Sequence, residues 1–233
     1  MGAIMRREIN SYFTSAVGYI FMAVFFLLSG LYFSNYFSAG VADMSYLFSA
    51  MFTITMFMIP VLTMRLMSED KKNKTDQALL TAPVSLGGVV FGKFFAACLM
   101  FLITISITLV EGIAVAVVAE LNWSLIFSNF SGLYLAGCAM ISIGMFISSL
   151  TENQVIAAVG AFAAALAMSF LDSIIPNINN AFLKKVAVGA SFTSRYKEFY
   201  RGILDVSNLI FFISIMAIFV FLTIRTLEKK RWS

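Results

Sequence analysis

The chain has 233 residues, of which 61% are hydrophobic and only 12% are charged. Water-soluble domains are closer to half apolar and about one-quarter charged, so this composition argues against a soluble enzyme. The 16 basic and 12 acidic residues give a formal net charge of +4. In a membrane protein, such a surplus orients the chain in the bilayer and does not by itself indicate nucleic-acid binding.

Long apolar segments without Asp, Glu, Lys or Arg recur along the chain. A helix of about 20 such residues crosses the hydrocarbon core of a bilayer, and the segments do not alternate as barrel strands do. We therefore predict an all-α integral membrane protein with one domain, 1–233, and six transmembrane helices. The predicted spans are residues 15–34, 46–64, 89–118, 130–150, 155–171 and 206–224. The first is too long for a usual signal peptide and is expected to remain in the protein.

The residues before the first span combine charged and aromatic side chains. Arg6, Arg7 and Glu8 stand next to Tyr12 and Phe13. This pattern is typical of a helix lying in the membrane interface, although it also fits simple anchoring by positive charge.

The distribution of Lys and Arg predicts the orientation of the bundle. With the N-terminus in the cytoplasm, cytoplasmic segments carry eleven of these residues and external segments carry five. The positive-inside rule then favours both termini inside. All five external residues fall in one connection before the last span: Lys184, Lys185, Arg195, Lys197 and Arg201.

The cytoplasmic connection between the second and third spans predicts a short helix. Thr75 is suited to cap it, Asp76 suits its first turn, and Pro83 ends it. Exposed Leu79 and Leu80 would make this helix a docking surface for a cytoplasmic partner. A solvated loop is the alternative.

Gly87, Gly92 and Lys93 match the spacing of a phosphate-binding loop, but Phe94 stands where a Ser or Thr would hold magnesium. No strand precedes the motif, so we do not predict a nucleotide site. Gly88 and Gly92 are better explained as a small face for close helix packing.

The external connection before the last span contains aromatic residues at helical spacing. Phe192, Tyr196, Phe199, Tyr200 and Ile203 would share one face of a helix. We predict an amphipathic helix on the outer leaflet or folded back over the bundle, where it would serve as an anchor or a gate.

Glu111 is the one acidic residue well inside an apolar segment. A carboxylate there must be paired, protonated or exposed to water. It would line a polar pathway or, as we favour, reach the interface at the outer end of the long third helix.

The fifth span is rich in alanine, including Ala157, Ala161 and Ala165. Small side chains let another helix approach closely, either within the same bundle or in a second subunit. The chain has no histidine, and Cys98 and Cys138 both fall inside spans. We therefore predict no catalytic residue, no metal site and no disulfide framework.

Four segments together resemble the permeases of ABC type-2 exporters, in the subgroup associated with gliding motility and copper-enzyme maturation. The segments are residues 6–13, 75–84, 201–212 and 227–232. Their order and spacing carry the resemblance, which covers nearly the whole chain. The sequence departs from the family pattern at Lys74, where Gly is frequent, at Gln77, where an acid is frequent, and at Ala16, where Pro is frequent.

The resemblance implies a membrane subunit of an ATP-driven exporter in the bacterial cytoplasmic membrane. It implies a dimer with a second copy or a homologous permease, and two ATPase subunits that bind ATP and Mg²⁺, while this chain binds no cofactor. The residues of a coupling helix seated in the ATPase would be Thr75, Asp76, Gln77, Leu79 and Leu80. A connecting helix would include Arg6, Arg7 and Tyr12, and an external gate helix would include Tyr196, Phe199, Arg201 and Asp205. The first and fifth spans would face the dimer axis.

Two other classes of function fit the sequence. An ion-gradient-driven transporter or channel would use Glu111 and need no ATPase, whereas a membrane scaffold would bind partners without moving a substrate. An intramembrane protease is disfavoured because histidine and a paired-aspartate motif are missing from the sequence.

Overall fold

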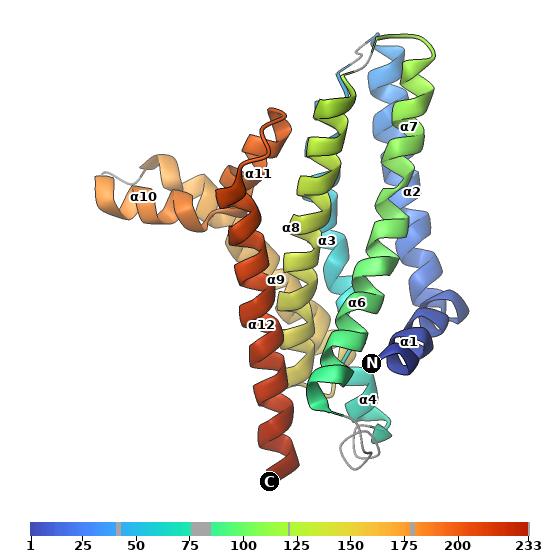
Figure 1. Ribbon diagram of the computed structural model, residues 1–233, viewed down its shortest axis with the longest axis vertical. Helices are drawn as coiled ribbons and strands as arrows, with labels where there is room; N and C mark the ends of the chain where they lie inside the picture. The colour runs from blue at the N-terminus through green and yellow to red at the C-terminus, as the bar shows by residue number, and fades with distance from the viewer. Residues whose placement is uncertain (41–42, 76–84, 121, 178–179, 233) are drawn as a thin grey trace.

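The computed structural model describes residues 1–40, 43–75, 85–120, 122–177 and 180–232, and the regular structure of this part is helical (Figure 1). The helices follow in the order α1 Gly2–Thr14, α2 Ala16–Ser38, α3 Ser45–Thr63, α4 Ser68–Lys72, α6 Leu86–Ile105, α7 Ile107–Ala116, α8 Trp123–Leu150, α9 Gln154–Ile174, η1 Ile175–Asn177, α10 Ala181–Ala190, α11 Phe192–Tyr200 and α12 Val206–Trp232.

Five helical segments are long and apolar enough to cross a membrane. They are Ala16–Ser38, Ser45–Lys72, Leu86–Ala116, Trp123–Leu150 and Val206–Lys230. In α9, the apolar stretch Gln154–Phe170 is shorter than these five. Five of the six predicted spans therefore have a matching helix, and a sixth crossing by α9 stays a prediction.

The third and fourth spans differ from their predicted limits. The third consists of α6 and α7, which meet at Ser106. The fourth begins at Trp123 instead of residue 130, because the Asn122 side chain accepts a hydrogen bond from the Leu125 amide and caps the helix. The polar residues Ser128 and Asn129 are buried inside this extension, so hydropathy alone placed its start too late.

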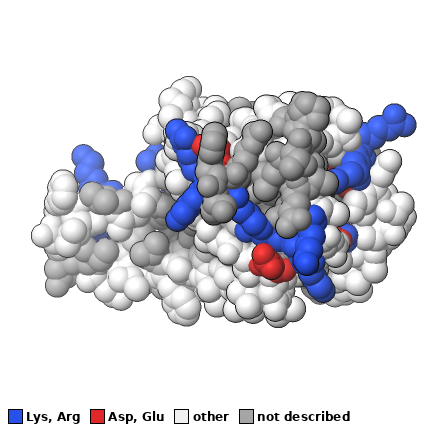
Figure 2. All heavy atoms as spheres, turned by 90° about the horizontal axis from the view of Figure 1, so that it is seen from below, with Lys and Arg blue, Asp and Glu red and all other residues white. Residues whose placement is uncertain are grey.

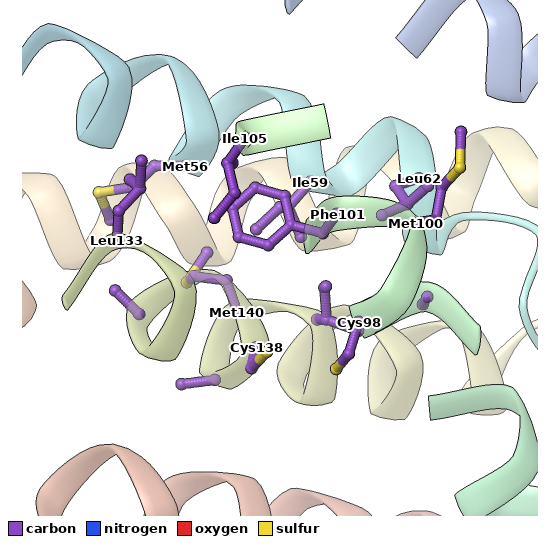
Figure 3. Close-up of a cluster of buried hydrophobic side chains, with 14 of the residues drawn as sticks. Met56, Ile59, Leu62, Cys98, Met100, Phe101, Ile105, Leu133, Cys138 and Met140 are labelled. Atoms are coloured by element: carbon purple, nitrogen blue, oxygen red, sulfur yellow. The ribbon is translucent and has the colours of Figure 1, made fainter. Parts of the chain in front are cut away.

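Residues of α3, α6 and α8 interlock at the centre of the bundle (Figure 3). Phe101 of α6 is fully buried there, and a Cβ added at Gly137 of α8 would lie 2.0 Å from its ring. A Cβ at Gly144 would lie 2.2 Å from the Thr63 hydroxyl of α3. Because lipid supplies no hydrophobic drive between helices, such close approach over small residues is what holds a membrane bundle together.

The alanine face of α9 packs inside its own bundle. Ala157, Ala161 and Ala165 are 0%, 3% and 0% exposed. Larger side chains lie on the opposite side, where Val159 and Phe162 are exposed. These three alanines pack inside the bundle, whereas Ala163 and Ala167 of the same helix are exposed, so a contact of that face with a second subunit stays a prediction.

The two ends of the bundle differ in what they carry. In Figure 1, α1, α4 and the C-terminus lie toward one end, and α10 and α11 lie in the other half. Lys and Arg gather on the end that carries α4 and the C-terminus (Figure 2). The exposed Lys and Arg residues described in α1, α4 and the segments at this end are Arg6, Arg7, Lys72, Lys74, Arg225, Lys229 and Lys230.

Candidate functional site

Helix α1 lies against α6 and the end of α3. Its Tyr12 is buried and donates a hydrogen bond from its hydroxyl to the Leu62 carbonyl at 3.3 Å. Its Ile4 fits against Gly92, where an added Cβ would lie 3.1 Å from Ile4 Cγ2. The chain then turns sharply into α2, since a Cβ at Gly18 would lie 2.1 Å from the Tyr12 carbonyl oxygen. Gly92, one of the two glycines of the small face predicted on α6, thus seats the N-terminal helix.

Four charged residues from three helices meet beside this contact, and we name them the charged junction: Arg7, Glu8, Asp70 and Lys93. Lys93 of α6 is 2% exposed, and its Nζ lies 3.0 Å from Glu8 Oε1 of α1 and 2.7 Å from Asp70 Oδ2 of α4. Arg7 Nη2 lies 2.7 Å from Glu8 Oε1 and 3.5 Å from Asp70 Oδ1. The junction is formally neutral, with two cations and two anions.

Burial makes the pairing in the junction necessary. A buried ammonium without an anionic partner is strongly disfavoured, and removal of one partner leaves the other charge uncompensated. Burial lowers the pKa of the Arg7 guanidinium, but its hydrogen bond and charge interaction with Glu8, together with Asp70, outweigh this and raise that pKa. The junction therefore joins α1, α4 and α6 through charges that depend on one another.

The junction leads directly to the predicted coupling helix. The Thr75 hydroxyl donates a hydrogen bond to Asp70 Oδ1 at 2.8 Å, and Thr75 is the last residue described before the gap. Asp76, Gln77, Leu79 and Leu80 lie outside the described residues. The capping role of Thr75 and the helix itself stay predictions.

Helix α4 is also fixed to the end of α8. The Ser148 hydroxyl accepts hydrogen bonds from the Met67 and Ser68 amides, both at 3.1 Å, and Lys71 donates to the Ser149 carbonyl. Arg65 Nε forms an ion pair with Glu69 at 2.7 Å. A displacement of α4 would therefore act on α8 as well as on α1 and α6.

The apparent phosphate-loop motif has a different role in the structure. Gly87, Gly92 and Lys93 all lie within helix α6, and the Lys93 ammonium is engaged in the charged junction. These three residues therefore form part of a helix instead of a loop, and the absence of nucleotide binding stays a prediction.

Helix α11, which the sequence analysis predicts to be external, is folded back over the bundle. Phe192, Tyr196 and Phe199 are buried, as the predicted face requires. The Tyr196 hydroxyl donates to the Phe48 carbonyl at 3.2 Å, and its ring stacks on Phe52 with centroids 4.3 Å apart.

The predicted face of α11 extends too far toward the C-terminus. The helix ends at Tyr200, and Gly202 adopts a positive φ of 81°. Ile203 consequently lies beyond the helix and is 50% exposed, which corrects its assignment to the buried face. Asp205 has a structural role, since its Oδ1 accepts a hydrogen bond from the Ser207 amide at the start of α12.

Arg195, which the sequence analysis placed only among the external basic residues, connects α10, α11 and α12. Its Nε donates to the Gly189 carbonyl at 3.2 Å, and its Nη1 donates to Ser207 Oγ at 3.1 Å and Asn208 Oδ1 at 3.0 Å. Its guanidinium also lies 5.2 Å from the centre of the Phe211 ring. Arg201, by contrast, is exposed and forms an ion pair with Glu198 at 3.7 Å.

Glu111 is paired inside the bundle. It is 7% exposed, and the Ser29 hydroxyl of α2 donates to its carboxylate, with oxygen distances of 2.9 and 2.8 Å. The Glu111 carboxylate therefore has a hydrogen-bonding partner within the bundle, and its depth relative to the membrane interface stays a prediction.

The five long apolar helical segments found among the described residues identify a multi-pass membrane protein. A comparison with known protein families matches residues 44–232 to the family described as ABC-2 family transporter protein. Because this match covers most of the chain, the protein belongs to the ABC-2 transporter family and is a membrane component, or permease, of a transporter. No match was found among curated proteins. Helices α1 and α2 precede the matched residues.

The members of the charged junction were not recognised together from the sequence. From the sequence, Lys93 is considered only in the false phosphate-loop motif and Arg7 and Glu8 only in the predicted interfacial helix, and Asp70 is not singled out. One signal in the sequence could have indicated the junction, namely a lysine near the start of a long apolar helix. A charge at such a position needs an oppositely charged partner. The sequence did not indicate which two helices supply it.

Proposed function

We propose that this permease is the transmembrane subunit of an ATP-driven exporter and works as a dimer with two separate ATPase subunits. The observation that carries this proposal is the charged junction, in which buried Lys93 joins α1 and α4 to α6. The family supports the transport role and the kind of partner. The subgroup associated with gliding motility and copper-enzyme maturation, and the bacterial inner membrane, belong to the same proposal.

In this mechanism, the ATPase subunits act on the segment that follows Thr75. Thr75 is bonded to Asp70, and Asp70 is paired with Lys93 and Arg7. Movement of the segment would therefore reach α6 and α1 through direct contacts, and such chains of ion pairs and hydrogen bonds carry energetic coupling between distant sites. The helices would then change tilt about the dimer axis and open outward.

The proposed topology has six crossings with both termini in the cytoplasm. Helix α9 has 21 residues, which at 1.5 Å per residue is about 31 Å, enough to cross the hydrocarbon core. With α9 as a crossing, the basic end that carries α4 and the C-terminus faces the cytoplasm, in agreement with the positive-inside rule.

The test of the proposal is purification in mild detergent and a search for a bound ATPase. Replacement of Leu79 and Leu80 by Asp should abolish ATPase co-purification and transport while the bundle stays inserted. The matched control is replacement of Lys184 and Lys185 by Asp, which introduces two acidic residues in exposed α10. A normal complex with full activity in the Leu79/Leu80 variant would contradict the coupling assignment.

An ion-gradient-driven transporter is the second candidate, and the buried pair of Glu111 and Ser29 is the observation in its favour. It predicts activity that depends on an ion gradient without ATP and is lost in Glu111→Gln. The family favours the first candidate.

A further inference from the structure

A cavity of about 470 Å³ lies between α3, α9 and α11. Ligand sites in proteins have volumes of roughly 300–1,000 Å³, so the space suits a small molecule. Along α3 it extends from Ser49 to Phe57, a separation of eight positions, which corresponds to about 12 Å of helix. The cavity is therefore elongated along α3, in the half of the bundle that carries α11.

The floor of the cavity is apolar. Phe52, Met56 and Tyr196 contribute to its lining and are 5%, 3% and 3% exposed. The Tyr196 hydroxyl is already bonded to the Phe48 carbonyl, so this residue offers the cavity mainly its ring. A hydrocarbon chain placed here would contact rings and a thioether without leaving a polar group unpaired.

The rim is polar and carries one positive charge. Ser49, Thr53 and Lys197 are exposed and also line the cavity. Burial and the charge of Asp43 raise the pKa of Tyr200, another lining residue, so its hydroxyl is neutral at pH 7. Of the ten described lining residues, Lys197 is then the charged one.

We propose that this cavity binds a single-chain amphiphile with an anionic head. The chain would lie between the aromatic side chains of α3 and α11, and the head would lie beside Lys197 and the hydroxyls of Ser49 and Thr53. An apolar floor beneath a cationic, hydroxyl-bearing rim matches the two parts of such a molecule. Binding itself requires no ATP, and only its assignment as cargo rests on the proposed function.

The test uses the full-length chain and two photoreactive probes with the same diazirine-bearing acyl chain. One probe is lysophosphatidylglycerol, which is anionic, and the other is lysophosphatidylcholine, which has no net charge. We expect the anionic probe to label peptides of α3 and α11 more strongly. The Lys197→Gln variant should lower its labelling about two- to five-fold, the upper range for one exposed ion pair, and should leave the neutral probe unchanged.

Two further variants separate the cavity from its surroundings. Lys184→Gln removes the same charge from exposed α10 and should change nothing. Ser49→Trp fills the exposed mouth and should lower labelling by both probes. Equal labelling of the exposed faces of α2 and α12, or unchanged labelling in Lys197→Gln, would overturn the proposal. So would a disulfide between two copies of a Ser49→Cys variant, because it would show a second chain covering the cavity.

A final labelling experiment with the ATPase partner present distinguishes a transported amphiphile from a resident lipid. Labelling that disappears during ATP turnover would identify the bound molecule as cargo, whereas persistent labelling would identify a resident lipid; both outcomes support the site. Labelling with no partner ATPase found would keep the site and remove the proposed function.

Discussion

Lys93 Nζ and Asp70 Oδ2 lie 2.7 Å apart, across the contact between a transmembrane helix and the short helix that leads to the predicted coupling segment. Asp70 and Lys93 are 23 positions apart in sequence, and the undescribed residues 76–84 lie between them. The same ammonium holds Glu8 of α1 at 3.0 Å. One buried charge thus joins the three elements on which a cytoplasmic motor would act.

Replacement of Lys93 by Gln should uncouple the permease from its ATPase. The change leaves the partly buried carboxylates of Glu8 and Asp70 without their common partner, at a cost of about 1–3 kcal/mol. We expect a lower melting temperature in detergent and loss of ATP-driven transport, measured in reconstituted vesicles with the partner ATPase.

The matched control is Lys74→Asn, which removes a neighbouring exposed charge. Lys74 has a φ of 56°, and Asn tolerates this left-handed conformation better than most residues. The control should behave as the unmodified protein. Transport at the normal rate by Lys93→Gln would show that the junction does not transmit force.

Much of the architecture was predictable because membrane helices follow from composition and length. The limits of α3, 45–63, are within one residue of the predicted span, since apolar character ends where the helix ends. The start of α8 was missed because Ser128 and Asn129 are polar yet buried. Hydropathy measures the preference of a residue for an apolar environment over water, and tertiary packing overrides that preference at Ser128 and Asn129.

Contacts between distant segments were less predictable than helices. The periodicity of Phe192, Tyr196 and Phe199 predicted their shared buried face correctly. It did not predict the end of α11, because the turn at Gly202 depends on a positive φ. Lys93, which pairs with Glu8, and Ser29, which bonds to Glu111, come from helices far away in sequence, and periodicity within one helix carries no information on them.

The close packing of small residues in α8 leads to a prediction about the stability of the bundle. Gly144→Ala would place a Cβ 2.2 Å from the Thr63 hydroxyl and should destabilise the bundle by about 1–3 kcal/mol. Gly30→Ala in α2 is the matched control, because nothing lies within 4 Å of its added Cβ. The thermal unfolding of both variants in detergent checks this, and partial recovery in Gly144→Ala with Thr63→Ala would confirm the cause. Equal melting temperatures for the two single variants would contradict the close α3–α8 contact.

The stable packing of α11 against the bundle should depend on Arg195. Arg195→Gln removes hydrogen bonds to Gly189 and to residues at the start of α12. We expect faster hydrogen exchange in α11, whereas Arg201→Gln, at an exposed and longer ion pair, should leave exchange unchanged. Similar exchange in both variants would show that aromatic packing alone holds the helix.

The pair formed by Glu111 and Ser29 distinguishes the two transport mechanisms. In Glu111→Gln, the amide oxygen still accepts the Ser29 hydrogen bond, so ATP-driven transport should continue at a similar rate. Glu111→Leu leaves the Ser29 hydroxyl without this partner and should lower stability by about 1 kcal/mol. Transport assays with and without an imposed ion gradient provide the measurement. If Glu111→Gln lost activity and added ATP did not restore the wild-type rate, the ion-driven mechanism would be favoured.

The most direct test of the account is photo-crosslinking from Lys72, an exposed residue at the end of α4. A photoreactive amino acid at this position should capture an ATPase subunit in membranes, and the yield should change when ATP is added. The same amino acid at Lys184 of α10 should capture none. Capture from Lys184, or an absence of ATPase at both positions in an active transporter, would contradict ATP-driven coupling through the α1–α4 end of the bundle.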